Sequence, residues 1–134
     1  MTDLEAVLYT YLASVTALTA TLGTFEGSKC LYASNDLPEG YTPQEHGSAC
    51  IFKIRGGEES FSSKQLAPSV QFRCYAESEA KARTVVYALF DAVNDHRAAG
   101  IKWCRAETLP QIIIEPDVGW PYGLLYSRFW MDNP

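Results

Sequence analysis

Few side chains in this chain of 134 residues are of the kinds that perform nucleophilic or acid–base catalysis. Its histidines and cysteines are His46, His96, Cys30, Cys50, Cys74 and Cys104. A cysteine nucleophile requires a histidine base and a third group that orients this base, and no spacing in the sequence assembles such a set. His46 follows Glu45 in a segment rich in turn-forming residues, where an exposed histidine without a special role is expected. We therefore predict no catalytic site, with a small hydrolase or ligand-binding domain around His46 as the alternative.

Metal ions and cofactors are not expected for similar reasons. The cysteines lack the C-x-x-C spacing of zinc sites. Three of them, Cys30, Cys50 and Cys74, stand beside apolar residues in predicted strands, where a free cysteine acts as a small buried hydrophobe. The chain contains no glycine-rich phosphate-binding motif, no G-x-S-x-G and no H-E-x-x-H. Reduced cysteines indicate synthesis in the cytoplasm, with disulfide formation as the alternative.

The composition predicts one acidic, folded domain that spans residues 1–134. Hydrophobic residues make up 47% of the chain and charged residues 20%, which is typical of a globular protein of this length with a single core. Sixteen acidic and eleven basic side chains give a formal net charge of −5. This charge excludes a general attraction to nucleic acid or anionic lipid, although it is compatible with a local basic patch.

Residues 6–25 carry no charged side chain, but no membrane segment is expected there. The helical part would be about 25 Å long, which is shorter than a hydrocarbon core of about 30 Å. Asp3 and Glu5 precede it, where a secretory signal peptide has basic residues.

A first helix is predicted for residues 3–22. Its apolar stripe has spacings of three and four and consists of Leu4, Leu8, Tyr11, Val15, Leu18 and Leu22. Thr2 and Glu5 fit a capping box, and Gly23 fits the left-handed residue that ends a helix. The opposite face is small and hydroxylated, which is typical either of a polar surface or of a face that packs on another subunit. The subunit-interface candidates on this face are Thr10, Ser14, Ala17 and Thr21.

Strand and helix periods alternate through the rest of the chain. Strands are predicted for residues 29–33, 50–55, 70–76, 101–107, 111–115 and 122–131. The positions expected to face the core in the third of these are Val70, Phe72, Cys74 and Ala76. Ser78 is placed to cap a second helix over 79–98, whose last turn would hold His96 and Arg97. Gly56 and Gly57 predict a turn that is followed by a hairpin arm; the arm would occupy residues 61–64.

These elements predict an α+β fold, with an antiparallel or mixed sheet of about four to six strands and two helices packed on one face. The last predicted strand is apolar on both sides, and its two sets of side chains are Leu124, Tyr126 and Trp130, and Leu125, Phe129 and Met131. Helices on one side of a sheet require only one apolar face. We therefore expect a loop or a neighbouring chain to cover part of the second face. The further subunit-interface candidates are Leu125, Phe129 and Met131.

A long loop over residues 34–49 separates two predicted strands and has no apolar period. Loops of this length in a compact domain are functional or mobile, so we expect this one to contact a partner. The partner-binding candidates in it and near the following turn are Asp36, Glu39, Tyr41, Glu45, His46, Glu58, Glu59 and Phe61. The carboxylates lack an EF-hand register and are interpreted as solvated charges, not as metal ligands.

The order of elements resembles that of the tail-completion or tail-terminator proteins of long-tailed bacteriophages, a group that includes tail-to-head joining proteins. The resemblance covers nearly the whole chain and lies in LEAVLYTYLASVTALTATLG, KCLYAS, ACIFKIRGG, SVQFRCYAESEAKARTVVYALFDAVND and YGLLYSRFWM. Its most specific part is the strand that ends at Tyr75 and Ala76, with the cap at Ser78 and the helix that holds Ala80 and Leu89. The chain departs from the family pattern in its long loop over residues 36–47 and in a final strand that ends almost at the C-terminus.

This resemblance implies a structural virion protein without enzymatic activity, made in the host cytoplasm and located at the head–tail junction. It implies a homohexameric ring that closes the head-proximal end of the tail tube and stops its polymerisation. The implied partners are other copies of the chain, the tail tube protein and the head-completion or neck protein. DNA would pass through the lumen without specific binding. A head-closure or neck protein of similar size is the nearest alternative.

A ring also requires two different patches on each subunit, because its interfaces are heterologous. The uncharged helix face and the outer sheet face are the candidates.

Overall fold

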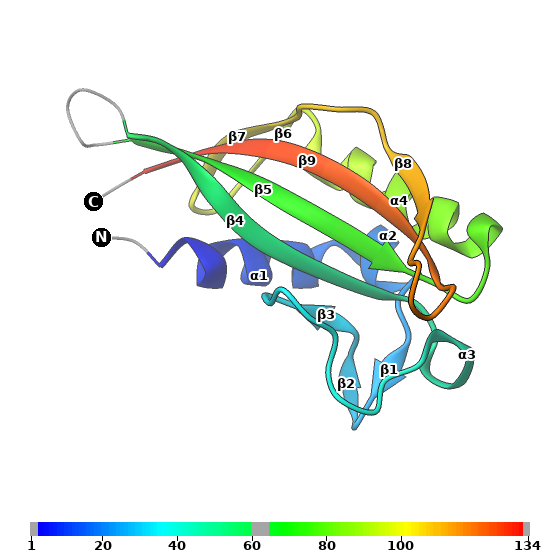
Figure 1. Cartoon of the computed structure of the whole chain (residues 1–134). Helices are drawn as coiled ribbons and strands as arrows, with labels where there is room; N and C mark the ends of the chain where they lie inside the picture. Colours follow the sequence, from blue (N-terminus) through cyan, green and yellow to red (C-terminus); the bar gives the residue numbers. More distant parts are fainter. Residues whose placement is uncertain (1–2, 60–64, 133–134) are drawn as a thin grey trace.

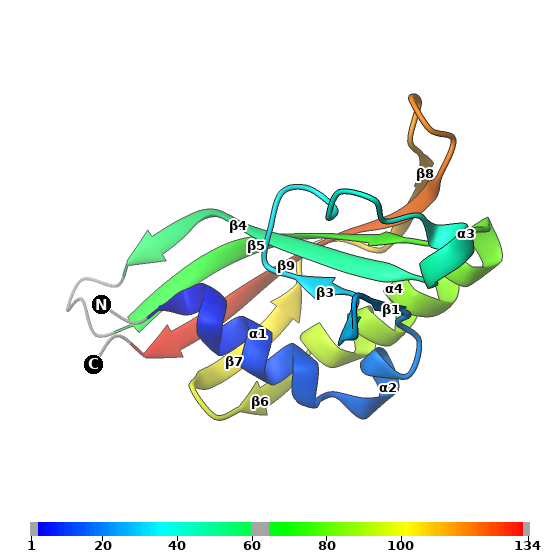
Figure 2. The same ribbon diagram turned by 90° about the horizontal axis from the view of Figure 1, so that it is seen from below.

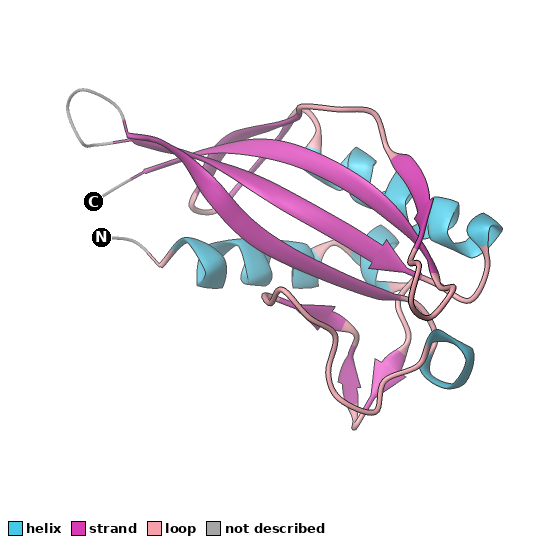
Figure 3. Cartoon of the chain, in the orientation of Figure 1, coloured by secondary structure: helices cyan, strands magenta, loops and turns pink. Residues whose placement is uncertain are grey.

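The computed structural model describes residues 3–59 and 65–132, which form a curled sheet with the two longest helices on one side (Figure 1; Figure 3). The helices are α1 (Leu4–Ser14), α2 (Thr16–Thr19), α3 (Pro43–His46) and α4 (Glu79–Val93). The strands are β1 (Thr24–Phe25), β2 (Ser28–Lys29), β3 (Leu31–Tyr32), β4 (Ala49–Glu59), β5 (Gln65–Tyr75), β6 (His96–Ala98), β7 (Ile101–Ala106), β8 (Gln111–Ile114) and β9 (Pro121–Asp132). Figure 2 shows α1 and α4 on the same side of the sheet. The predicted α+β class is confirmed.

The main sheet has seven strands, in the order β3-β4-β5-β9-β7-β6, with β8 paired to β9. The β7 and β8 strands share one edge of β9, where β8 pairs with residues 121–124 and β7 with residues 127–131. Every pair is antiparallel except β3–β4. The sheet exceeds the predicted size because β6, with only three residues, forms inside a segment that was predicted as helix.

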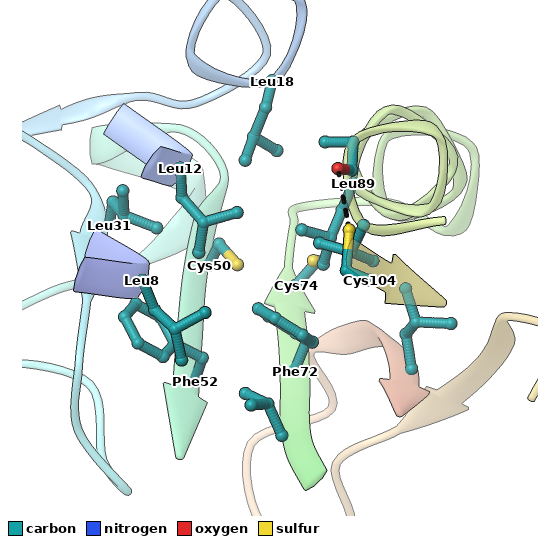
Figure 4. Packing of buried hydrophobic residues seen from close by; sticks show 14 of the residues in the cluster. Leu8, Leu12, Leu18, Leu31, Cys50, Phe52, Phe72, Cys74, Leu89 and Cys104 are labelled. Carbon is teal, nitrogen blue, oxygen red and sulfur yellow. Dashed lines mark hydrogen bonds between the residues drawn. The ribbon is translucent and has the colours of Figure 1, made fainter. Parts of the chain in front are cut away.

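The core lies between the sheet and the helices. Val70, Phe72 and Cys74 of β5 are fully buried, as their alternation predicted. The helices bring apolar side chains onto this surface, and Figure 4 shows among them Leu8, Leu12, Leu18 and Leu89. Burying a leucine contributes about 1.5–3 kcal/mol. The helix layer is therefore held mainly by these contacts.

The core-facing side and the outward side of β9 are exchanged relative to our assignment. Leu125, Phe129 and Met131 are fully buried in the core, so their assignment to a subunit interface is wrong. Gly123 has the same parity, and α4 packs directly on it through Val86. The side chains on the outward face of β9 are Tyr122, Leu124, Tyr126, Arg128 and Trp130. Both sets alternate as predicted, but alternation in one apolar strand does not tell which set the helices cover.

The predicted first helix is broken at Val15. This residue is extended, with φ −82° and ψ 100°, and it separates α1 from α2. In one continuous helix, with about 3.6 residues per turn, positions 12 and 18 would point in different directions. The break lets Leu12 and Leu18 both enter the core, where they are fully buried.

The ends of this region also differ from the prediction. Asp3 caps α1, because its Oδ1 accepts a hydrogen bond of 3.1 Å from the Ala6 N–H, whereas Thr2 lies outside the described residues. Gly23 is not left-handed. A Cβ there would lie 1.8 Å from the His46 carbonyl oxygen, so the glycine permits close packing of two backbone segments.

The second helix ends at Val93, five residues before its predicted end. Asn94 is extended and Asp95 is left-handed with φ 58°, a conformation that Asp tolerates better than most residues. The Asp95 N–H donates to the Cys104 carbonyl, and the Asn94 Oδ1 accepts from the Ala106 N–H. These bonds turn the chain into β6. His96 therefore lies in an edge strand instead of the last helical turn.

Gly56 and Gly57 do not form the predicted turn. A register shift between Ile54 and Gly57 marks an irregularity in the β4–β5 ladder, and pairing then continues to Glu59 and Leu66. Glycines in a strand are typical of such bulges. The predicted arm over residues 61–64 lies outside the described residues. The predicted strand over residues 29–33 is divided at Cys30 into β2 and β3.

Candidate assembly surfaces

The sheet face opposite the helices, here called the outer face, has a covered half and an open half. At the covered half, residues 33–48 run along the β3–β4 edge on the side away from α1 and α4, and the β8–β9 turn projects on that same side (Figure 1; Figure 2). Ile51 and Tyr75 belong to this face but are only 2% and 4% exposed. The Arg73 guanidinium donates to the Asn35 carbonyl and so ties the loop to the sheet. The expected cover of the second face is thus provided in part by the chain's own loop.

Tyr41 holds this loop in place instead of presenting a free side chain. It is 3% exposed and lies edge-on to Phe25 and Trp120. Its hydroxyl donates to the Gly47 carbonyl, and burial raises its pKa well above the usual range. The side chain is unavailable to a partner while the loop has this conformation.

His46 belongs to the same small cluster. Its ring lies edge-on to Phe25 with centroids 4.6 Å apart, and its Nδ1 accepts a 3.2 Å hydrogen bond from the Thr42 N–H. Cys50 contacts the main core instead, so the structure does not bring His46 and Cys50 together as a catalytic pair.

The other partner-binding candidates are scattered. Asp36, Glu39 and Glu45 are exposed on the loop. The backbones of Glu58 and Glu59, at the end of β4, pair with β5. Phe61 lies outside the described residues.

The four thiols are free and buried. Burial raises the pKa of Cys30 and of Cys104, while a hydrogen bond with Cys50, together with burial, raises that of Cys74. These three side chains are therefore thiols at neutral pH, whereas a nucleophile requires a thiolate. The interpretation of the cysteines in the strands as buried hydrophobes is confirmed.

Within residues 3–59 and 65–132, no group of three or more His, Cys, Asp and Glu side chains is arranged to hold a metal ion. No described helix is long and apolar enough to cross a membrane.

The open half of the outer face is basic, and we call it the basic half. Its cations come from four strands and are Lys53, Arg55, Arg97, Lys102, Arg105 and Arg128. Arg105 of β7 and Arg128 of β9 are register partners, so two like charges lie directly opposite each other. Arg128 has a compensating carboxylate in Glu107, 3.7 Å away. This surface contrasts with the net negative charge of the whole chain.

Aromatic rings lie among these cations. Trp103 and Trp130 are register partners on β7 and β9, and their rings stack with centroids 5.0 Å apart. An open depression around them is lined by Asp95, Arg97 and Lys102 as well. The Arg55 guanidinium lies 4.7 Å from the centre of the Tyr126 ring. The basic half therefore offers flat rings between positive charges.

The uncharged helix face keeps its predicted character but is shorter than predicted. Thr10, Ser14 and Ala17 are exposed, and Thr21 is half-buried. The break at Val15 leaves Thr10 and Ser14 on α1 and Ala17 on α2, whereas Thr21 lies in the turn after α2. The hydroxyls of Ser14 and Thr21 donate to backbone carbonyls three residues earlier, at 2.6 Å each. Because these donors are already satisfied, another surface can cover them without leaving them unpaired.

A second patch, which is mainly apolar, was not predicted. It joins α4 to the β7–β8 connection and contains Tyr87, Phe90, Leu109 and Pro110, with the exposed Asp91 beside them. Leu109 is 76% exposed and Tyr87 is 55% exposed. Large apolar side chains that gather on a surface are typical of contact sites. We call this group the Leu109 patch.

Comparison with known proteins gives a structural likeness alone. No family model and no curated protein matches the chain. The structure is similar to a chain in the solved structure "Virion of native gene transfer agent (GTA) particle", with a TM-score of 0.67 and 14% sequence identity. The likeness covers 97% of this chain and 95% of that chain. The two chains therefore share a fold over nearly their whole length.

Sequence reasoning missed the basic half, although part of the signal was present. Lys53 and Arg55 occupy alternate positions in CIFKIR, and Arg105 and Arg128 alternate with buried residues in their own strands. Period-2 alternation places each of these cations on an outward face. The strand order was the missing information, because only the pairing of β7 with β9 brings Arg105 next to Arg128.

Proposed function

We propose that this chain is a structural virion protein of a phage-like particle, and that it forms a ring at the head-proximal end of a tail tube. The observation that carries the proposal is the fold shared with a chain of a gene transfer agent virion over 97% of the sequence. The sequence resemblance to tail-terminator proteins supports the more specific role. In that role the ring ends tube assembly and joins the tail to the head-completion or neck protein.

The surfaces of the subunit suit such an assembly. A ring requires two different patches, one for each neighbour. The uncharged helix face around Thr10 and the Leu109 patch lie on different elements, and both consist mainly of side chains without charge, with Asp91 lining the second. We propose these as the two sides of the subunit contact. A homohexamer is the expected stoichiometry.

The same surfaces favour a non-enzymatic role. The described thiols with raised pKa are buried, and His46 is packed between rings. The alternative of a small hydrolase around His46 and Cys50 lacks the contact that it requires, because the two side chains belong to different clusters.

The mass of the protein in solution and its binding to the ends of tail tubes test the proposal. Light scattering at micromolar concentration, with and without purified tail tubes, is expected to give a discrete ring near six times the 14.9 kDa chain mass, or rings bound at one end of each tube. Electron microscopy of the tubes reports the second result. A strictly monomeric protein that ignores tube ends would refute the role. Binding to DNA-filled heads but not to tubes would instead indicate the head-closure or neck protein.

A matched pair of variants tests the helix face. Thr10→Glu places a charge on the uncharged face of α1, while Thr84→Glu places the same charge on the exposed side of α4. A carboxylate buried in an interface without a partner is strongly unfavourable. Thr10→Glu should therefore reduce the assembled fraction, and Thr84→Glu should leave it unchanged. Equal behaviour of the two variants would remove the helix face from the proposed contact.

A further inference from the structure

We infer that the basic half of the outer face binds the phosphate backbone of nucleic acid without sequence preference. This inference goes beyond the ring and does not depend on it. Six cations share this half, and two carboxylates that lie beside them are Asp95 and Glu107. Both carboxylates have other contacts. Asp95 accepts the Trp103 Nε1–H at 2.8 Å, and Glu107 accepts the Ser69 hydroxyl at 2.6 Å.

Three of the six cations of the basic half are poorly compensated within the described part of the subunit. The side chains of Lys53, Arg97 and Arg105 are exposed, and these side chains have no ion pair or hydrogen bond with any described residue. Arg105 also lies opposite Arg128, and like charges opposite each other in a sheet are destabilising. An anion on this surface would relieve the repulsion. Repulsion of this kind is expected on a surface that binds an anion when the protein functions.

The rings between the cations favour nucleic acid as this anion. Trp103 and Trp130 form a stacked pair, and Tyr126 lies under the Arg55 guanidinium. Aromatic rings among positive charges are typical of surfaces that follow a nucleic acid backbone and stack on exposed bases. Phosphate contacts of this kind read no sequence.

The acidic surface of a second copy is the competing occupant. A protein interface would have to match each buried cation with a carboxylate in a fixed position, or leave its desolvation uncompensated. A phosphate backbone is a continuous line of charge that neutralises cations at many spacings while they remain hydrated. The described cations Lys53, Arg55 and Arg105 are spread along two strands and are all exposed, which suits the backbone better.

Salt-dependent binding of DNA tests the inference. The probes are a labelled duplex of about 30 base pairs and an oligothymidine of about 30 nucleotides, titrated with the full chain between about 50 and 200 mM salt. Fluorescence polarisation should show binding that weakens as salt rises. Binding of either probe supports the inference, because both carry the phosphate backbone. No binding of either probe at the lowest salt would overturn it.

Two double variants of equal charge locate the surface. Lys53→Gln/Arg105→Gln removes two cations from the basic half, and Lys81→Gln/Arg83→Gln removes two from the exposed side of α4. The first should reduce the slope of log K against log salt by about two, and the second should leave the slope unchanged. Equal loss in both variants would mean that only total charge matters. Loss of oligomers with unchanged DNA binding in the first variant would assign the surface to a second copy. Either result overturns the inference.

Discussion

Gly123 of β9 lies directly beneath Val86 of α4, and a Cβ on the glycine would be 2.5 Å from the valine Cβ. The same added atom would be 2.8 and 2.9 Å from the two valine methyl groups. Both residues are buried, so neither can move into solvent. The glycine therefore sets how closely the helix layer approaches the sheet.

Gly123→Ala is expected to destabilise the protein by about 1–3 kcal/mol, because it overpacks the contact between α4 and β9. Urea unfolding monitored by tryptophan fluorescence measures the change. Val86→Ala keeps the valine Cβ but removes the two methyl groups that the new Cβ would also meet. The double variant should therefore recover part of the loss and be more stable than the sum of single effects predicts, by about 0.5–3 kcal/mol. Strict additivity would show that the two methyl groups do not take part in the clash.

The basic half makes a second prediction about stability. Arg105→Gln removes one of two opposed cations and should raise the free energy of unfolding by about 0.2–1 kcal/mol. The gain should shrink as salt is added, because salt screens exposed charges. Chemical unfolding at low and high salt measures both effects. Arg83→Gln on α4 is the control, and a loss of stability in Arg105→Gln alone would contradict the repulsion.

The elements that were predicted correctly are those with long, unbroken periods. The alternation of Val70, Phe72 and Cys74 located β5 and its buried side, and Ser78 was correctly identified as the cap of α4, since its Oγ accepts from the Lys81 N–H. Both signals are local. They act within one strand or one helical turn, so a sequence contains them completely.

The errors arise where a distant contact overrides a local pattern. The helical stripe continued through Val15, but packing of Leu12 and Leu18 into one core required a break there. His96 fitted a helix end, but the β6–β7 hairpin draws it into a strand. The face of β9 was misassigned because its direction depends on which side α4 covers. None of these contacts is encoded within a single periodic segment.

Replacing each of two tyrosines by phenylalanine should change the stability of the protein in opposite directions. The Tyr32 hydroxyl is buried and makes no hydrogen bond of ordinary geometry with a described residue; its polar neighbour is the Cys30 thiol, a weak hydrogen-bonding group. The Tyr11 hydroxyl donates to the Ala92 carbonyl. Tyr32→Phe should leave stability unchanged or raise it by about 1 kcal/mol, since it removes an unsatisfied group. Tyr11→Phe should lower it by about 0.5–1.5 kcal/mol. Thermal unfolding of the two variants measures both changes, and a larger loss in Tyr32→Phe would mean that its hydroxyl has a partner.

Alkaline pH is expected to destabilise the fold. Burial, and then contact with the Cys30 thiol, raises the pKa of Tyr32 to about 12, and burial is also the main cause that raises the pKa of Tyr75 to about 12. The pKa values of Cys30 and Cys74 are raised as well, the latter chiefly by its hydrogen bond with Cys50. The folded state therefore keeps protons that the unfolded chain releases from thiols near pH 9.0 and from phenols near pH 10.0.

Because the folded state binds these protons more tightly, their contribution to stability is complete below about pH 9 and is lost as the pH rises toward about 12. The melting temperature should fall over this interval in a series of buffers of equal ionic strength. Tyr75→Phe removes one of the groups and should make the fall shallower above about pH 10, where the unfolded phenol ionises. A melting temperature that stays constant or rises through this interval would show that the buried thiols and phenols do not hold their protons in the folded state.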